Sequence, residues 1–249
     1  AACLVYLMLA DLLTNTGLHT IHGPGYVASL LFLVPGFPMI TSILDMVRMD
    51  FTAGLSRAAY SFGLILAATM SAWMFSAATG LQPLPAQTVF PYPWAWLAYA
   101  VATACGVAGF AVIFNSPPRT VAWAAALGAC GNLCRLALVS VNLPAQLAAG
   151  VGGVIIGFLA GPLSARTTLP RITLTVPACV IMVPGASMYR TVYWLNGQDM
   201  TKALTFGVDA VLTVILIACG LAVARMCTDP AWARNLPVPS PHAFKFSKD

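Results

Sequence analysis

The residues of this sequence that could do chemistry are a few ionisable side chains inside long apolar runs. Arg135 follows fifteen uncharged residues, and Asp209 lies some eight residues into an apolar run. Arg190 comes directly after Tyr189, shortly past a Pro-Gly pair. An ionised group at the centre of a membrane helix costs roughly 2.5–3.5 kcal/mol, so such residues are expected to bind substrate, move ions or pair with one another.

Each of these side chains suits a different task. Arginine can hold a carboxylate through two parallel hydrogen bonds, which makes Arg190 the first candidate for a substrate clamp, with Tyr189 beside it. Asp209 is a candidate for carrying a proton or another coupling ion, or for pairing with an internal arginine. Arg135 could pair with Asp209, reach the outer interface, or act as the clamp itself.

Further polar residues belong to the ends of the expected helices. Asp45 lies one turn before Arg48, and this spacing favours a local ion pair. Arg119 is expected at the cytoplasmic interface, with Asn115 capping the end of the preceding helix. The predicted coupling and charge network comprises Asp209, Arg135, Asp45, Asn115, Arg119 and Asn132.

Two segments built around a Pro-Gly pair contain Asp45 in the first case and Tyr189 with Arg190 in the second. Segments 27–55 and 176–204 share eight identities when they are superposed at an offset of 149 residues. Proline removes a backbone donor and glycine adds freedom, so each apolar helix should be interrupted at this pair. A repeated, interrupted membrane helix is typical of transporter binding sites. The predicted substrate-binding residues are Pro35, Gly36, Met39, Thr41, Ser42, Pro184, Gly185, Met188, Tyr189 and Arg190.

The two copies are expected to differ in chemistry. Backbone donors at a restarting helix face the break with partial positive charge, so the substrate carboxylate should lean toward the second copy, where Arg190 lies. The first copy has Thr41 at the equivalent place, and its backbone carbonyls or the hydroxyls of Thr41 and Ser42 would serve the ammonium or hydroxyl end of the substrate. Asp50 and Asp199 precede Thr52 and Thr201 at the starts of long apolar runs and are interpreted as N-caps rather than transport residues.

Composition predicts an all-α, polytopic membrane protein. Of 249 residues, 59% are hydrophobic and 8% are charged, the mean hydropathy is +0.85, and glutamate is absent. A soluble domain carries about 25% charged residues. The net charge of +5 is dispersed, which excludes a nucleic-acid surface. Nucleotide-binding, nucleophile and metal-ligand motifs are absent, so no enzyme, cofactor or metal site is expected.

Eight apolar segments are expected to cross the bilayer, the first of them short. Their approximate ranges are 1–13, 26–47, 52–79, 94–115, 118–141, 144–164, 172–195 and 201–226. Residues 1–79 would form the C-terminal part of a first repeat, 80–93 a proline-rich non-cytoplasmic loop, 94–226 a second repeat, and 227–249 a cytoplasmic tail. Basic residues gather in the loops of one side, which the positive-inside rule makes cytoplasmic. Five crossings separate equivalent points of the copies, so the repeats should be inverted.

Three motifs carry a resemblance to a known family. They are GFAVIFNSPPR at 109–119, GACGNLCR at 128–135 and VPGASMYR at 183–190. In order and spacing they resemble the threonine/serine exporter (ThrE) family and its two-component relatives, the YjjP and YjjB proteins linked to dicarboxylate export. Residues 105–226 resemble the C-terminal half of that family, and 1–79 the latter part of its N-terminal half. The resemblance implies five spans plus five after a soluble domain, so this chain is expected to lack that domain and about two spans.

The resemblance supplies the expected substrate class. It implies a secondary active exporter of small carboxylate-bearing metabolites in the cell inner membrane, L-threonine and L-serine first, driven by the proton gradient. A dicarboxylate exporter, a passive channel whose filter is lined by the breaks, and a structural membrane subunit that needs a partner are the alternatives. A homo-oligomer and a missing partner subunit are both left open.

Overall fold

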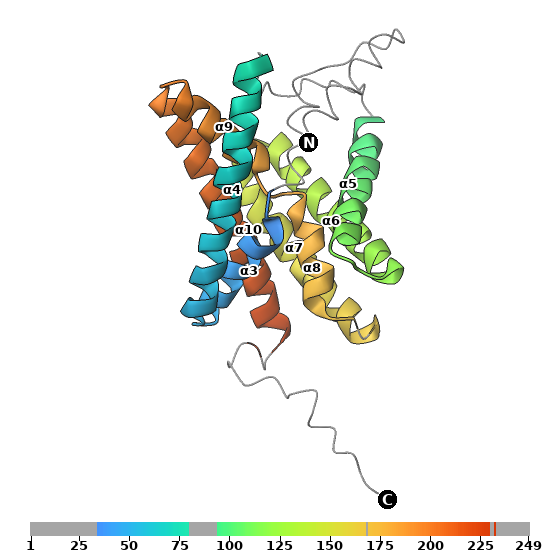
Figure 1. Ribbon diagram of the computed structural model, residues 1–249. Helices are drawn as coiled ribbons and strands as arrows, with labels where there is room; N and C mark the ends of the chain where they lie inside the picture. Colours follow the sequence, from blue (N-terminus) through green and yellow to red (C-terminus); the bar gives the residue numbers. More distant parts are fainter. Residues whose placement is uncertain (1–33, 80–93, 168, 230–231, 233–249) are drawn as a thin grey trace, which may run out of the picture.

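A computed structural model of the chain describes residues 34–79, 94–167, 169–229 and 232. Regular structure in this part is entirely helical, so the predicted all-α fold class is confirmed (Figure 1). The helices are α3 (Gly36–Val47), α4 (Phe51–Thr79), α5 (Trp94–Ile113), α6 (Pro118–Ser140), α7 (Ala145–Thr167), α8 (Arg171–Val180), α9 (Gly185–Asn196) and α10 (Met200–Thr228). Where a predicted segment falls on described residues, its ends lie within three residues of a helix end.

Most of these helices are long and apolar enough to cross a membrane. Within the described residues α4, α5, α6, α7 and α10 qualify singly, and α8 with α9 forms a sixth candidate that bends by 47° at its break. The polytopic membrane class is therefore confirmed. The count of eight stays a prediction, because the first predicted segment and residues 26–33 of the second lie outside the described residues. The predicted loop 80–93 and most of the predicted tail lie outside them as well.

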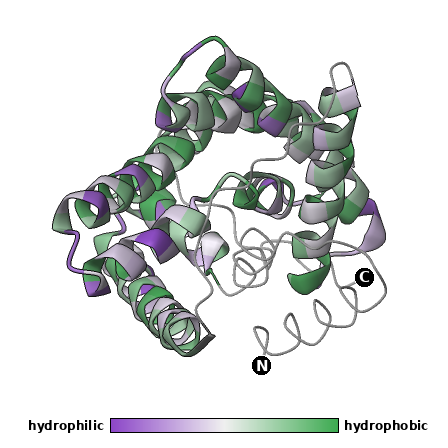
Figure 2. Cartoon of the chain, turned by 90° about the horizontal axis from the view of Figure 1, so that it is seen from above, coloured by the Kyte–Doolittle hydropathy of each residue, from purple (hydrophilic) through white to green (hydrophobic). Residues whose placement is uncertain are grey.

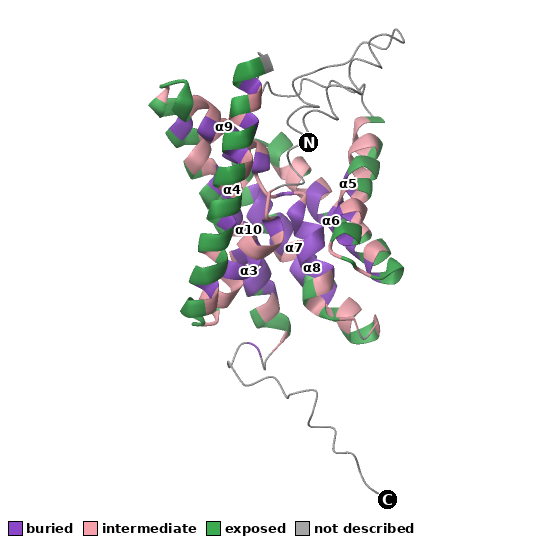
Figure 3. Cartoon of the chain, viewed as in Figure 1, coloured by how far each residue is buried: buried purple, intermediate pink, exposed green. Residues whose placement is uncertain are grey.

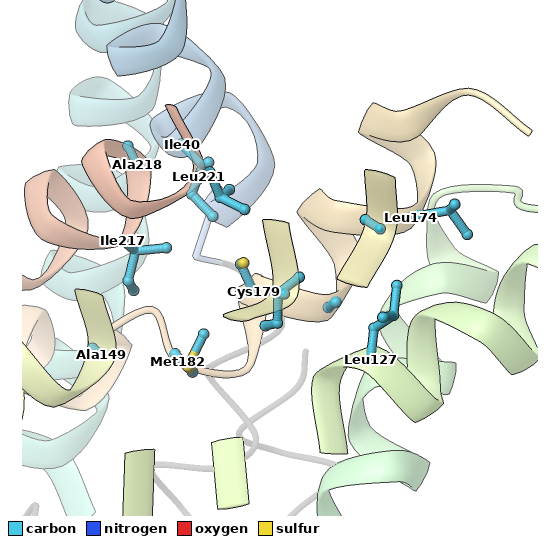
Figure 4. Packing of buried hydrophobic residues seen from close by; sticks show 12 residues of the cluster. Ile40, Leu127, Ala149, Leu174, Cys179, Met182, Ile217, Ala218 and Leu221 are labelled. Atoms are coloured by element: carbon cyan, nitrogen blue, oxygen red, sulfur yellow. The ribbon is translucent and has the colours of Figure 1, made fainter. Parts of the chain in front are cut away.

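The core lies where α3, α7, α8 and α10 meet. Ile40, Cys179, Met182 and Ile217 pack together there from three of these elements and the break, all of them buried (Figure 4). Figure 3 shows burial concentrated in this centre and much lower burial along α4 and α5. Helices pack closely in a membrane through small residues rather than through expulsion of water.

Contact between α7 and α10 illustrates that packing rule. A Cβ built on Gly153 would lie 2.8 Å from the carbonyl oxygen of Ile217, and one built on Gly220 would collide with the carbonyl oxygen of Gly150. Gly150 and Gly153 on α7, with Gly220 on α10, therefore allow these two helix backbones to approach closely.

The outward faces of the helices are apolar. Phe62, Met74, Leu204 and Val211 are large hydrophobic residues that stay more than half exposed in the chain alone. Figure 2 shows hydrophobic residues predominating along the helices. Such faces suit lipid tails, which are as apolar as the side chains themselves.

Helices α3–α4 and α9–α10 form two hairpins with the same backbone plan. At the offset of 149 residues, the four helix boundaries of one hairpin coincide with those of the other. The turns also match, because Met49 and Gln198 both adopt a positive φ, 64° and 60°. In Figure 1, α3 leads from the centre of the molecule to one end and α9 leads from the centre to the opposite end.

Both long helices of the hairpins begin at a capping aspartate. Asp50 Oδ1 accepts a hydrogen bond from the Ala53 amide (3.2 Å), and Asp199 Oδ1 accepts one from the Lys202 amide (3.1 Å). The N-cap interpretation is thus confirmed. Hydrogen bonds from the Lys202 side chain and amide also lower the pKa of Asp199 below its ordinary value.

Candidate functional site

The two Pro-Gly breaks lie against each other. A Cβ built on Gly36 would be 3.2 Å from Cγ1 of Val180, the last residue of α8, and 3.4 Å from Cγ2 of Val183 in the second break. Residues of both breaks line a cavity of about 40 Å³ together with Phe110 and Ile181. We call this place the break junction; its lining residues are Val34, Gly36, Phe110, Val180, Ile181, Val183 and Gly185.

Similar local geometry starts the helix at each break. Pro35 (φ −77°, ψ 62°) and Pro184 (φ −81°, ψ 54°) precede α3 and α9, and each accepts the amide of the residue four positions later. The first amides of a helix have no partner within that helix. In α3 one of these positions is Pro38, which has no N–H, whereas the equivalent residue in α9 is Ser187. The start of α9 therefore offers more donors and more partial positive charge to the break junction than the start of α3.

The predicted hydroxyl ligands of the first copy bond within their own helix. Thr41 Oγ1 donates to the carbonyl oxygen of Phe37 (3.0 Å), and Ser42 Oγ donates to that of Met39 (2.8 Å). Both side chains are buried. A helical hydroxyl readily bonds to the carbonyl one turn back, so these two groups are engaged in this conformation.

Tyr189 and Arg190 follow the second break on α9, as the sequence indicated. Tyr189 is buried at 3% exposure. The Arg190 guanidinium is half-buried and lies over the ring of Phe206 on α10, 5.5 Å from its centroid. Its placement thus ties α9 to α10, the two helices of one hairpin.

A larger cavity, about 410 Å³, lies between the two hairpins. Its lining joins equivalent residues of the two copies, for example Met39 with Met188 and Ser42 with Thr191. Nearly all other lining positions pair in the same way at the offset of 149 residues: Ile43 with Val192, Ala58 with Gly207, Ser61 with Ala210, Phe62 with Val211, Ile65 with Val214, and Leu66 with Ile215. Because the described lining is mostly apolar and carries no charged side chain, this cavity does not suit a charged metabolite.

Asp209 and Arg135 do not pair with each other, which overturns one of the alternatives for Arg135. Asp209 Oδ1 accepts a hydrogen bond from Gln146 Nε2 on α7 (2.6 Å). Arg135 Nε donates to Asn132 Oδ1 (2.8 Å), and Asn132 Nδ2 donates to Thr103 Oγ1 on α5 (2.8 Å). The two groups are held on different helix pairs, α7–α10 and α5–α6.

The expected local pair of Asp45 with Arg48 is wrong. Asp45 instead forms an ion pair with Arg57 on α4. Because α3 ends at Val47 and the chain turns back, α4 brings Arg57 alongside Asp45, whereas Arg48 occupies the cap position.

Asn115 and Arg119 lie at the turn between α5 and α6. Asn115 adopts a positive φ of 54° just after the end of α5, and the Ser116 amide donates to the carbonyl oxygen of Ala111 (3.0 Å). This geometry ends a helix with a left-handed residue. Arg119 is exposed in the first turn of α6.

Four partners of the predicted residues were not expected from the sequence: Thr103, Gln146, Phe206 and Arg57. Gln146 offered a signal, because it is a polar side chain in an otherwise apolar run. Thr103 and Phe206 are ordinary membrane-helix residues whose role depends on which helices become neighbours. Among the described residues, no group of three or more His, Cys, Asp or Glu side chains could hold a metal ion.

Comparisons with known proteins confirm the family resemblance that the three sequence motifs indicated. A family model described as "Threonine/Serine exporter, ThrE" matches residues 99–227, and one described as "Putative threonine/serine exporter" matches residues 1–79. An uncharacterized protein from Haemophilus influenzae is 37% identical over 82 residues, which cover 33% of this chain and 28% of that relative. The match thus spans less than a third of the curated relative. No solved structure matches the chain.

Proposed function

The chain belongs to the threonine/serine exporter family, and from that premise we propose that it exports small carboxylate-bearing metabolites through the break junction. L-threonine and L-serine are the first candidates, and the proton gradient is the driving force. The proposed setting is the cell inner membrane, with the C-terminus in the cytoplasm and the two hairpins as inverted repeats.

The contact between the two Pro-Gly segments, at the starts of α3 and α9, carries this proposal. Secondary transporters place substrate sites where interrupted helices of two repeats meet, because only there is backbone freed from helical hydrogen bonding inside the membrane. Gly36 and Gly185 line one cavity, and the hairpins that follow them lead to opposite ends of the molecule. A cavity of about 40 Å³ is too small for an amino acid, so we assign this conformation to a closed state of the pathway.

The amides at the start of α9 support an anionic cargo. Their partial positive charge favours a carboxylate at the second break. Amino acids and dicarboxylates both present that group. Asp209 is the proposed proton carrier, because it lies within a spanning helix and its described side-chain partner is the neutral Gln146.

Transport by the purified full chain in sealed vesicles tests the proposal. Vesicles loaded with labelled threonine, serine or a dicarboxylate should release label when a pH gradient is imposed. Asp209→Asn should abolish this gradient-driven release while leaving exchange of labelled for unlabelled substrate partly intact. Equal release with and without the gradient would indicate a channel. Absence of movement for every compound would point to a structural subunit or to a missing partner.

A further inference from the structure

Arg135 is a cation inside a spanning helix with no described carboxylate to neutralise it. Each described aspartate interacts with another group. Asp45, Asp199 and Asp229 form ion pairs, Asp50 caps a helix, and Asp209 accepts a hydrogen bond from Gln146. The Arg135 side chain is half-buried on α6. A charge inside a membrane is costly and is retained as a rule where it serves a pathway.

The guanidinium is also oriented by its neighbours. Its Nε donates to Asn132 Oδ1 (2.8 Å), one turn back along α6. Asn132 is in turn fixed by its hydrogen bond to Thr103 on α5, and these two side chains are 6% and 5% exposed. The bond draws the arginine toward the interior of the helix pair rather than toward the end of α6. Within the described residues, Nη1 and Nη2 make no hydrogen bond or ion pair, so this edge of the fork is available for two parallel bonds.

This cluster adjoins the break junction. A Cβ on Gly106, one turn from Thr103, would lie 3.0 Å from Cδ1 of Ile181, which lines the junction. A Cβ on Gly128 would lie 3.1 Å from the carbonyl oxygen of Ala178 on α8. Arg135 is seven residues farther along α6, or about 10 Å of rise. It therefore lies beyond the junction on the side opposite Arg119.

We infer that Arg135 binds the carboxylate of the transported metabolite, and that Asn132 and Thr103 position its guanidinium for this contact. The inference rests on the proposed export function. It adds a second anion-binding site, distinct from the amides at the start of α9. Arg190 differs from Arg135 because its charge lies over the Phe206 ring of its own hairpin.

Competition binding on the purified full chain tests the inference, with labelled threonine as tracer. Threonine and threoninamide differ in that the carboxylate is replaced by a neutral amide. In the wild type we expect threonine to compete at least about tenfold better, as a charged hydrogen bond implies. Arg135→Gln should weaken threonine binding by about that factor and leave threoninamide nearly unchanged, so that the preference disappears. Arg135→Lys should be intermediate, because it keeps the charge and loses the fork.

Matched controls separate positioning from general damage. Arg166→Gln removes the same charge at an exposed site in the last turn of α7 and should keep the wild-type preference. Thr103→Val loses the hydroxyl that fixes Asn132 and should reduce the preference several-fold, whereas Thr103→Ser should retain it. This pair keeps the test decisive if Arg135→Gln fails to fold.

The outcomes distinguish the inference from the proposed function. An Arg135→Gln protein that prefers threonine as strongly as the wild type overturns the carboxylate role, and equal behaviour of Thr103→Val and Thr103→Ser overturns the positioning role. If the wild type binds neither threonine nor a dicarboxylate, the proposed function itself fails. If it binds only a dicarboxylate, the same comparison is made with that compound and its monoamide.

Discussion

The two hairpins have one backbone plan and two different sets of cross-links. In the first, Asp45 on α3 forms an ion pair with Arg57 on α4. The equivalent positions in the second hairpin hold Trp194 and Phe206, and these rings lie under the cations of Lys202 and Arg190. Helix lengths, turn geometry and capping aspartates nevertheless coincide at the offset of 149 residues.

This difference teaches which features the architecture requires. The Pro-Gly break, the left-handed turn residue and the aspartate cap set where each helix begins and ends, so they occur in both copies. The contacts between the two helices of a hairpin can be ionic or aromatic, because either holds the hairpin together. If the copies are inverted, the two hairpins face opposite sides of the membrane, and their polar chemistry is free to differ.

Substitution of Gly54 is expected to give the largest loss of stability among the changes that distinguish the first hairpin from the second. A Cβ there would lie 2.8 Å from the carbonyl oxygen of Ser42 and 2.7 Å from Met46 Cγ, whereas the equivalent residue of the second hairpin, Ala203, already carries a buried Cβ. Gly54→Ala should therefore force α4 away from α3 and cost about 1–3 kcal/mol in stability, as overpacking does. Thermal unfolding in detergent measures the change.

Gly63 is the matched control for that substitution, because it lies on the same helix and a Cβ there would meet nothing within 4 Å. Gly63→Ala should be neutral or slightly stabilising, since alanine favours a helix over glycine by up to about 1 kcal/mol. Equal unfolding temperatures for the two variants would contradict the close approach of α3 and α4 at Gly54.

The ion pair between Asp45 and Arg57 should have the smaller effect. Their side chains are 24% and 50% exposed, and exposed ion pairs contribute about 1 kcal/mol or less. Asp45→Asn, Arg57→Gln and the double variant form a cycle in which the coupling free energy is read from thermal unfolding. A coupling well above this value would show that the first hairpin depends on its ionic cross-link.

Sequence patterns were sufficient for the helices and for the breaks. Long apolar runs predict the spans, and Pro35-Gly36 with Pro184-Gly185 predict where α3 and α9 begin. Capping by Asp50 and Asp199 followed from their positions before helix starts. These features depend on neighbours in the chain, which the sequence displays directly.

Side-chain partners that lie on different helices could not be predicted from the sequence in the same way. The one-turn spacing predicts that Asp45 pairs with Arg48, yet the chain reversal at Met49 brings Arg57 to Asp45 instead. The sequence allows Asp209 to pair with Arg135, but packing of α7 against α10 brings Asp209 to Gln146. Such pairings depend on which helices are adjacent, and similar apolar helices carry little information about their order.

Accessibility of the two hairpin turns is the most direct test of the central claim, that equivalent hairpins point to opposite sides of the membrane from a shared break junction. Met49→Cys and Gln198→Cys, at equivalent exposed turn positions, would be introduced singly into a background without the seven native cysteines. Intact cells would then be treated with a membrane-impermeant maleimide. The account predicts labelling of Gln198→Cys in intact cells and labelling of Met49→Cys only after the membrane is opened. Labelling of both from the same side would contradict it.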